Sequence, residues 1–94
     1  MGTPNRWQKK TDSNQADIVL ALEKIGCSVF DASLFGGGFP DLVVGRGGTT
    51  WLMEVKQGKG KLNAKQTAFH SGWCGHIAVV RTPMEAINVV TQDG

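Results

Sequence analysis

Short apolar runs separated by turn-forming residues dominate the middle of the chain. Leu42–Val44 and Trp51–Val55 flank a glycine-rich turn at residues 45–48, and this pattern is typical of a β-hairpin. Another short run, Cys27–Phe30, precedes the hairpin, and Ile77–Val80 follows it. Because Ile77–Val80 is apolar without interruption, the sequence predicts a central strand that is covered on both faces.

Helical periodicity predicts three helices around these strands. Ile18 and Leu22 recur at helical spacing, and Gly26 is placed to end that helix in the left-handed conformation. Asn63 and Thr82 are N-cap residues, and Thr82 is followed by proline and then by Glu85, which favours a helix start. The predicted helices are Ser13–Ile25 with Ser13 or Asp12 as its cap, Ala64 to about Trp73, and a segment that begins at Pro83.

The order of these elements is α-β-β-β-α-β-α, which places the chain in the α/β class. The hairpin is antiparallel, whereas a helical crossover between the third and fourth strands favours a parallel pair. The sequence therefore predicts one mixed sheet in a single domain over residues 13–94, since 94 residues suffice for one modest core.

Residues 1–12 precede this domain and are basic, with Arg6, Lys9 and Lys10. They lack usable periodicity and are interpreted as a flexible N-terminal arm that either contacts phosphates or has no role. No apolar run is long enough to cross a bilayer, and Met1–Ser13 lacks the apolar centre of a signal peptide. We expect a cytoplasmic protein with no membrane partner. The net charge of +2 is too small to identify a nucleic-acid binder by itself.

Three charged residues lie where the predicted hairpin would bring them together. Asp41 stands at the start of the first strand, and Glu54 and Lys56 lie near the end of the second. Glu54 and Lys56 share a face because side chains alternate along a strand, and Asp41 joins them if it faces the same side. Two such carboxylates suit Mg²⁺ or Mn²⁺, which can activate water for attack on a phosphoryl group. Spacing alone equally allows an ordinary surface hairpin with solvated charges.

The same stretch resembles a known family. Pro40-Asp41 followed by Glu54-Val55-Lys56 is similar to the signature of the PD-(D/E)XK nuclease superfamily. The sequence of residues 38–45 and 52–56, followed by Leu62 and Gln66, resembles that of the small stand-alone VRR-NUC nucleases of phages and bacteria. The similarity extends from about Gln15 to about Val90. It implies a minimal restriction-endonuclease-like core and a metal-dependent endonuclease that hydrolyses DNA phosphodiester bonds. It also implies a homodimer acting on branched DNA such as four-way junctions, in a bacterial host cell if the gene is a phage gene.

The resemblance also implies roles for individual residues. Asp41 and Glu54 would hold the metal ion with the carbonyl oxygen of Val55, and Lys56 would position or activate the attacking water. Gln66 would contact that water or the substrate phosphate. The first helix of the superfamily carries an acidic residue about where this chain has Gln15, so Gln15 can orient a water or touch the substrate but adds no charge.

Lysines cluster in the loop beyond the hairpin, beside the predicted metal site. These lysines would form a basic rim that holds phosphates around the acidic metal site. The alternative is that they only make the loop soluble. The residues predicted to contact nucleic acid are Arg6, Lys9, Lys10, Arg46, Lys59, Lys61 and Lys65. The glycine-rich approach at residues 36–38 matches no phosphate-binding fingerprint and is interpreted as a flexible segment that lets a DNA backbone come close.

Two other classes of function remain open at this stage. The neutral Gln15 is compatible with a DNA-binding module of the same fold whose catalysis is weak or lost. An unrelated small α/β interaction domain would make the grouping of Asp41, Glu54 and Lys56 a coincidence. His70, Cys74 and His76, with Cys27 as a distant fourth ligand, do not have the spacing of a structural zinc site. Trp73 is expected either in the core or at an interface.

Overall fold

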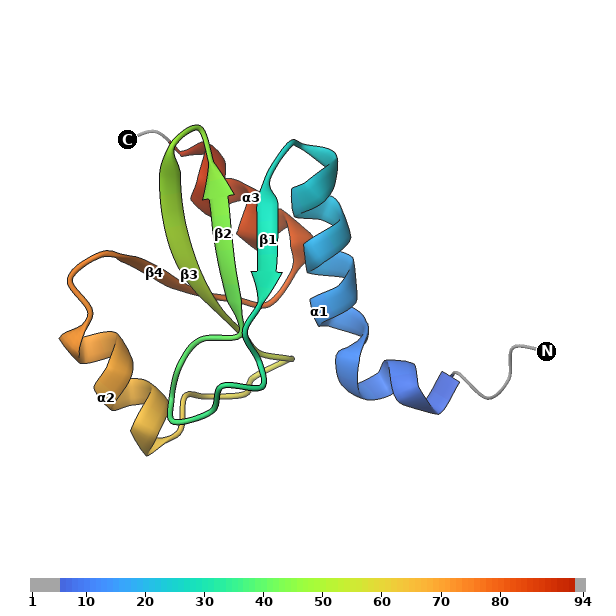
Figure 1. The fold of residues 1–94 in the computed structure, drawn as a ribbon. Coiled ribbons are helices and arrows are strands. Elements are labelled where there is room, and N and C mark those ends of the chain that lie inside the picture. Colours follow the sequence, from blue (N-terminus) through green and yellow to red (C-terminus); the bar gives the residue numbers. More distant parts are fainter. Residues whose placement is uncertain (1–5, 93–94) are drawn as a thin grey trace.

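The computed structural model describes the backbone of residues 6–92 and the side chains of residues 14–92. It has the predicted element order and a four-stranded mixed sheet (Figure 1). The elements are α1 Arg6–Lys24, β1 Ser28–Asp31, β2 Leu42–Arg46, β3 Thr49–Val55, α2 Ala64–Gly72, β4 His76–Val80 and α3 Pro83–Thr91. The predicted fold class is confirmed.

The strands follow one another across the sheet in the order β1-β2-β3-β4. β1 with β2 and β2 with β3 are antiparallel, and β3 with β4 is parallel because α2 intervenes between them. In the register, Phe30 pairs with Val43, Val43 pairs with Leu52, and Leu52 pairs with Ile77. These four apolar residues therefore form one row across one face of the sheet.

The core lies on the other face of the sheet, beneath α1 and α3. Ile18 and Leu22 of α1 pack there with Ala86 and Val90 of α3, and the strands contribute alternate residues such as Val44. Figure 1 shows α1 and α3 together on this side, while α2 stands apart from them near one end of the sheet. The described part of the chain thus has two packed layers, helices and sheet, and α2 contributes no buried residue.

Two sequence predictions need correction. β4 is an edge strand rather than a central one, and its residues Ile77 and Val79 are only partly buried. The continuous apolar run indicated cover on both faces, but the core of the described chain lies on the face of Val80, and the face of Ile77 and Val79 is only partly covered. In addition, α1 begins at Arg6 instead of Ser13. Residues 6–12 contain neither glycine nor proline, so an established helix continues through them without apolar periodicity.

Apart from the start of α1, the structure confirms the predicted end of α1 at Gly26 and the predicted caps of α2 and α3. Gly26 ends α1 with φ 94°, a conformation that costs glycine little. Asn63 and Gln66 form a reciprocal capping box on α2. Thr82 caps α3 by accepting a hydrogen bond from Glu85, whereas the Glu85 carboxylate turns to the amide of Arg81. None of the described helices combines the length and the apolar character that crossing a membrane requires.

Candidate active site

The hairpin register brings Asp41 to Glu54 and its neighbours. Leu42 pairs with Met53, so Asp41, one residue earlier, lies opposite Glu54, one residue later. Oδ2 of Asp41 accepts a hydrogen bond of 2.9 Å from the backbone amide of Val55. This bond fixes the Asp41 carboxylate against the Glu54–Lys56 segment, so the predicted convergence of these residues is present in the structure.

Glu54 is the one acidic residue in the buried set of the described chain, with 2% of its surface exposed. Burial, a hydrogen bond with Asp41 and the charge of Asp41 together raise the pKa of Glu54 to about 8, against a smaller opposing effect of Lys56. Oε1 of Glu54 is buried without a hydrogen-bond partner among the described residues. A buried carboxylate oxygen without a partner is costly, so this position favours either a proton or a cation.

Gln66 reaches the site from α2. Its Nε2 donates a hydrogen bond of 3.1 Å to Oε2 of Glu54. Its Oε1 accepts one of 2.9 Å from the amide of Asn63, and its own amide donates one of 2.9 Å to Oδ1 of Asn63. The predicted approach of Gln66 to the site is thus observed, and its described partner there is Glu54. The capping box that starts α2 also orients the amide that holds the buried carboxylate.

Lys56 follows β3 and is partly buried. Its amide donates to the carbonyl oxygen of Val80 at 3.1 Å, and its carbonyl oxygen accepts from Nδ2 of Asn14 at 3.0 Å. Asn14 also donates to the carbonyl oxygen of Arg81 at 3.5 Å. One side chain of α1 therefore ties together the ends of the two parallel strands. Sequence patterns gave no signal for Asn14, because a polar residue in an early helical turn looks solvent-exposed.

Gln15 binds a carboxylate that the sequence analysis did not single out. Its Nε2 donates to Oδ2 of Asp31 at 3.3 Å, while Ser33 donates to Oδ1 of Asp31 through its amide at 2.9 Å and its hydroxyl at 2.5 Å. These hydrogen bonds, those from Ser33 first, lower the pKa of Asp31 and keep it ionised. The sequence analysis missed Asp31 because its place beside Asp41 follows only from the pairing of β1 with β2.

A pocket of about 720 Å³ opens beside Asp41. α1 forms one wall, and the end of β1 with the loop that follows forms the other. The residues that line it are Gln15, Ala16, Val19, Leu20, Asp31, Ser33 and Asp41. The pocket presents two carboxylates and one amide above an apolar floor, which is a composition suited to a hydrated cation.

The residues present fit a hydrated Mg²⁺ or Mn²⁺ better than a metal held by protein alone. The described residues contain no group of three or more His, Cys, Asp or Glu side chains placed to share an ion. Mg²⁺ typically uses one or two carboxylates and keeps several waters or substrate oxygens. Asp41 and Glu54 supply that number, and the partnerless Oε1 of Glu54 is the observation that fits.

Gly38 fixes how α2 sits against the site. It has φ 88°, and a Cβ atom added to it would lie 2.5 Å from the carbonyl oxygen of Lys65 and 3.3 Å from the amide of Gln66. The loop backbone at Gly38 therefore packs directly against the backbone of α2 at Lys65 and Gln66, next to the side chain that binds Glu54. The glycine segment, interpreted from sequence as a flexible approach for DNA, contains at Gly38 a packing contact with α2.

The predicted nucleic-acid contacts are dispersed. Lys59, Lys61 and Lys65 are exposed on the loop after β3 and on α2, beside the site. The side chains of Arg6, Lys9 and Lys10, with their predicted contacts, lie outside the described residues. Arg46 lies at the far end of β2 from Asp41, where Nη1 donates to the carbonyl oxygen of Val90 at 3.3 Å.

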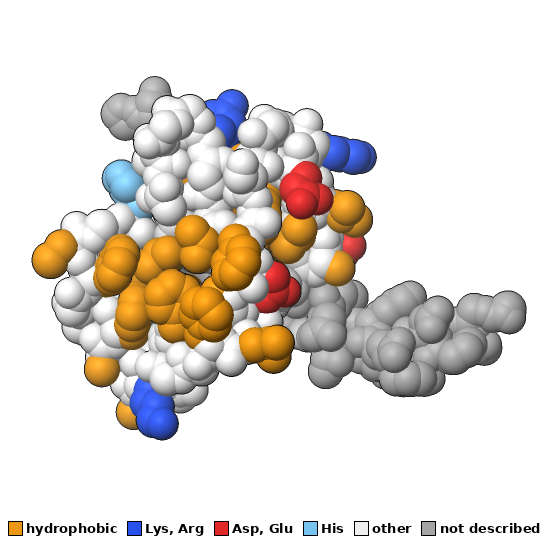
Figure 2. Space-filling model, viewed as in Figure 1, with side chains coloured by type: hydrophobic (Ala, Val, Ile, Leu, Met, Phe, Trp, Pro, Cys, Tyr) orange, Lys and Arg blue, Asp and Glu red, His pale blue; other side chains and the backbone are white. Residues whose placement is uncertain are grey.

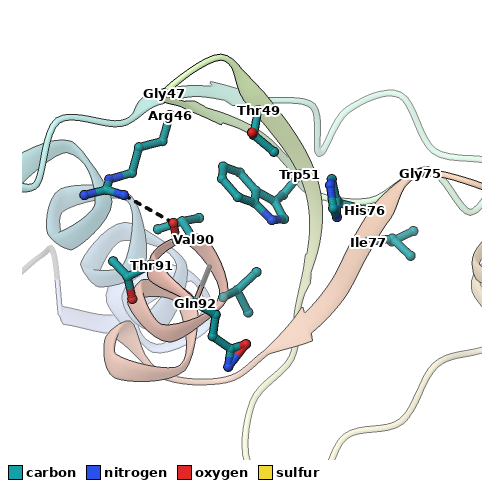
Figure 3. Close-up of a pocket in the computed structure, with 11 residues that line it drawn as sticks. Arg46, Gly47, Thr49, Trp51, Gly75, His76, Ile77, Val90, Thr91 and Gln92 are labelled. Atoms are coloured by element: carbon teal, nitrogen blue, oxygen red, sulfur yellow. Dashed lines mark hydrogen bonds between the residues drawn. The ribbon is translucent and has the colours of Figure 1, made fainter. Parts of the chain in front are cut away.

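Arg46 belongs to a second pocket, of about 840 Å³, at that far end of the sheet. Figure 3 shows Arg46 reaching towards Val90, with the Trp51 indole beside the imidazole of His76. The two rings have centroids 5.8 Å apart. This pocket is larger than the one at Asp41, but none of the described residues that line it carries a carboxylate. Among the described residues, the paired carboxylates of Asp41 and Glu54 lie at the opposite end of the sheet from this pocket.

Comparison of the chain with protein-family models, with curated proteins and with solved structures finds no match.

Proposed function

We propose that this protein is a divalent-metal-dependent deoxyribonuclease of the VRR-NUC type that hydrolyses phosphodiester bonds in branched DNA, such as four-way junctions, in the cytoplasm. The observation that supports it most is the buried Oε1 of Glu54, which has no described partner and lies in a carboxylate that interacts with Asp41. A divalent cation would satisfy this oxygen and relieve the repulsion between the two carboxylates.

In this proposal, Asp41 and Glu54 hold Mg²⁺ or Mn²⁺ together with the carbonyl oxygen of Val55. The bound ion would supply charge neutralisation at the scissile phosphate and an acidified water. Asp41 is fixed by the Val55 amide, and Gln66 holds the other carboxylate. Lys56 orients the attacking water or stabilises the charge that develops on the phosphoryl oxygens.

The surrounding residues support substrate binding. Gln15 and Asp31 line the pocket beside Asp41. In the proposal they orient a metal-bound water or the substrate. Lys59, Lys61 and Lys65 contact flanking phosphates and hold the nucleic acid in register, a role that carries no sequence information. Two such units in a homodimer would present two sites to the arms of a junction.

A DNA-binding module with weak or lost catalysis is the second candidate. The observation that favours it is the neutral amide of Gln15, which hydrogen-bonds Asp31 and brings no charge of its own to the site. On this reading the same loops bind DNA, but the two carboxylates hold metal too weakly for turnover. Replacing Gln15 with glutamate would then raise metal affinity and restore cutting.

Cleavage of a labelled four-way junction, beside linear duplex and single strand, tests the proposal with Mg²⁺ and with Mn²⁺. Asp41→Asn and Lys56→Ala should abolish metal-dependent cutting. Asp17→Asn and Lys24→Ala are matched controls, because both residues are exposed on α1, and they should cut as wild type does. Binding without cutting by wild type would favour the second candidate, and neither binding nor cutting would reject both.

A further inference from the structure

The pocket that contains Arg46 takes no part in the proposed nuclease site. Figure 2 shows hydrophobic side chains gathered over the face of the sheet opposite the core and towards α2. The pocket lies on the core face instead, because Trp51 in its lining pairs with the buried Val44. It opens where the last turn of α3 approaches the start of β4 (Figure 3). Its volume of about 840 Å³ is typical of a small-molecule site.

Trp51 and His76 form a pair of rings in the lining of this pocket. They are register partners on the parallel strands β3 and β4, so their side chains lie on the same face of the sheet. Their ring centroids are 5.8 Å apart, and their planes are inclined by 40°. Trp51 is partly buried against the core, whereas His76 is exposed. The pair is therefore anchored on one side and accessible on the other, as a surface for stacking a planar base requires.

Arg46 is the only Lys, Arg, Asp or Glu residue in the described lining of the pocket. Its Nη1 donates a hydrogen bond of 3.3 Å to the carbonyl oxygen of Val90, and this contact holds the guanidinium at the mouth of the pocket, between the hairpin and α3. A guanidinium has five N–H donors in a rigid fork, so one bond to a carbonyl oxygen leaves donors for a second acceptor. A phosphate group matches that fork in both charge and geometry.

The C-terminal end of α3 adds a different requirement. The last carbonyl groups of a helix have no partner within the helix and carry a partial negative charge, and Val89, Val90 and Thr91 of that last turn line the pocket. This side of the pocket therefore favours a ligand with N–H donors. A ligand that suits the whole pocket combines an anionic group, a planar ring and N–H donors on that ring. A nucleotide whose base carries an exocyclic amino group has all three.

We propose that this pocket is a nucleotide-binding site. The phosphate binds to Arg46, the base stacks against Trp51 and His76, and the amino group of the base points to the end of α3. A free nucleotide and an unpaired nucleotide of a nucleic acid share this chemistry. The inference goes beyond the proposed nuclease function, because the pocket lies at the opposite end of the sheet from Asp41 and Glu54 and includes neither of them.

Calorimetric titration of the full chain with adenosine monophosphate, adenosine and inorganic phosphate tests the proposal. Adenosine monophosphate should bind with one-to-one stoichiometry. Adenosine and phosphate should each bind at least about tenfold more weakly, because each lacks one of the two groups that the pocket contacts.

Three variants locate the binding. Arg46→Gln should weaken the binding of adenosine monophosphate by about tenfold or more and leave that of adenosine unchanged, since only the phosphate contacts the guanidinium. Trp51→Phe offers a smaller ring and should weaken the binding of both. Lys24→Gln is the matched control, because it removes one exposed positive charge outside the described lining of the pocket, and it should bind adenosine monophosphate as wild type does.

A single-stranded oligodeoxyadenylate distinguishes the two sources of the nucleotide. If the pocket serves nucleic acid, the oligonucleotide should bind more tightly than adenosine monophosphate, and Arg46→Gln should weaken its binding more than Lys24→Gln does. If the pocket serves a free nucleotide, adenosine monophosphate should bind at least as tightly as the oligonucleotide. Either result supports the proposal.

Two results would overturn the proposal. One is a wild type that binds neither adenosine monophosphate nor the oligonucleotide. The other is binding that Arg46→Gln and Trp51→Phe weaken no more than Lys24→Gln does, since the ligand would then lie elsewhere. Should Trp51→Phe fail to fold, Arg46→Gln decides alone, because Arg46 is exposed.

Discussion

The Nε2 amide of Gln66 donates a hydrogen bond of 3.1 Å to Oε2 of Glu54. The same side chain closes the capping box of α2 through Oε1. A single glutamine thus couples the start of a helix to the orientation of a buried carboxylate. A substitution of Gln66 should consequently change both the stability of α2 and the metal affinity of the candidate site, whereas a substitution of Asn63 should change mainly the stability of α2.

We expect Gln66→Ala and Asn63→Ala to differ in their effect on metal binding. Both remove part of the capping box and should lower the free energy of unfolding by about 0.5–2 kcal/mol. Only Gln66→Ala also releases Oε2 of Glu54, and loss of such a supporting contact typically lowers metal affinity or activity by about 10–100-fold. Calorimetric titration with Mn²⁺ measures the affinity, and denaturant unfolding measures the stability. Equal Mn²⁺ affinities in the two variants would contradict the coupling.

Glu54 should make the stability of the metal-free protein fall as the pH rises. Burial raises its pKa to about 8 in the folded chain, against about 4.3 in an unfolded chain. The folded state therefore binds the proton more tightly. The contribution of this proton to the free energy of unfolding is fully present below about pH 4.3 and is lost as the pH rises through about 8. Over that range the free energy of unfolding falls by at most about 1.4 kcal/mol per pH unit.

Denaturant unfolding in the presence of a chelator, at several pH values from 5 to 8, measures this slope. Glu54→Gln removes the titrating group and keeps a similar shape, so its free energy of unfolding should vary less over that range. Metal binding at neutral pH should also release a proton from Glu54, which is detected as a binding enthalpy that depends on the buffer. A wild-type slope equal to that of Glu54→Gln would show that Glu54 is already ionised without metal.

Much of this arrangement could be predicted from local sequence, because the features involved are local. Turn glycines, apolar runs and caps such as Asn63 depend on neighbouring residues, and they gave the correct order of elements. The hairpin then placed Asp41 beside Glu54, since a short turn leaves little choice of register. The lengths of the two runs and the turn between them were sufficient.

The features that sequence analysis missed depend on contacts between distant segments. Nothing near Asp31 indicates that Gln15 will reach it, and nothing near Asn14 identifies the carbonyl oxygens of Lys56 and Arg81 as its acceptors. The prediction that β4 is a central strand was wrong for a related reason. An apolar run shows that both faces avoid water, but it does not show whether the same chain or another chain provides the cover.

Gly38→Ala should impair the site more than Gly37→Ala does. Both glycines have positive φ, 88° and 65°, so alanine at either position costs about 1–2 kcal/mol of backbone strain. At Gly37 the added methyl group meets no atom within 4 Å, whereas at Gly38 it would lie 2.5 Å from the carbonyl oxygen of Lys65. Gly38→Ala should therefore displace α2 and Gln66.

The comparison of these two variants uses both unfolding and cleavage. Gly37→Ala should lose some stability and keep the wild-type rate of metal-dependent cutting. Gly38→Ala should lose more stability and cut more slowly even under conditions where it is fully folded. Similar cleavage rates for the two folded variants would indicate that the loop can shift away from α2 without disturbing Glu54.

Asn14 should be essential as an amide, because both of its described acceptors are carbonyl oxygens. Asn14→Ala leaves the carbonyl groups of Lys56 and Arg81 without this donor, at a cost of about 1–3 kcal/mol. Asn14→Asp should be worse at neutral pH, since it directs a carboxylate at two acceptors. Folding then raises the pKa of the new aspartate, so its deficit relative to Asn14→Ala should shrink as the pH falls through that pKa. Thermal unfolding of the two variants at pH 4 and pH 7 measures this crossover, and an aspartate variant as stable as alanine at both pH values would show that Asn14 does not bridge the strand ends.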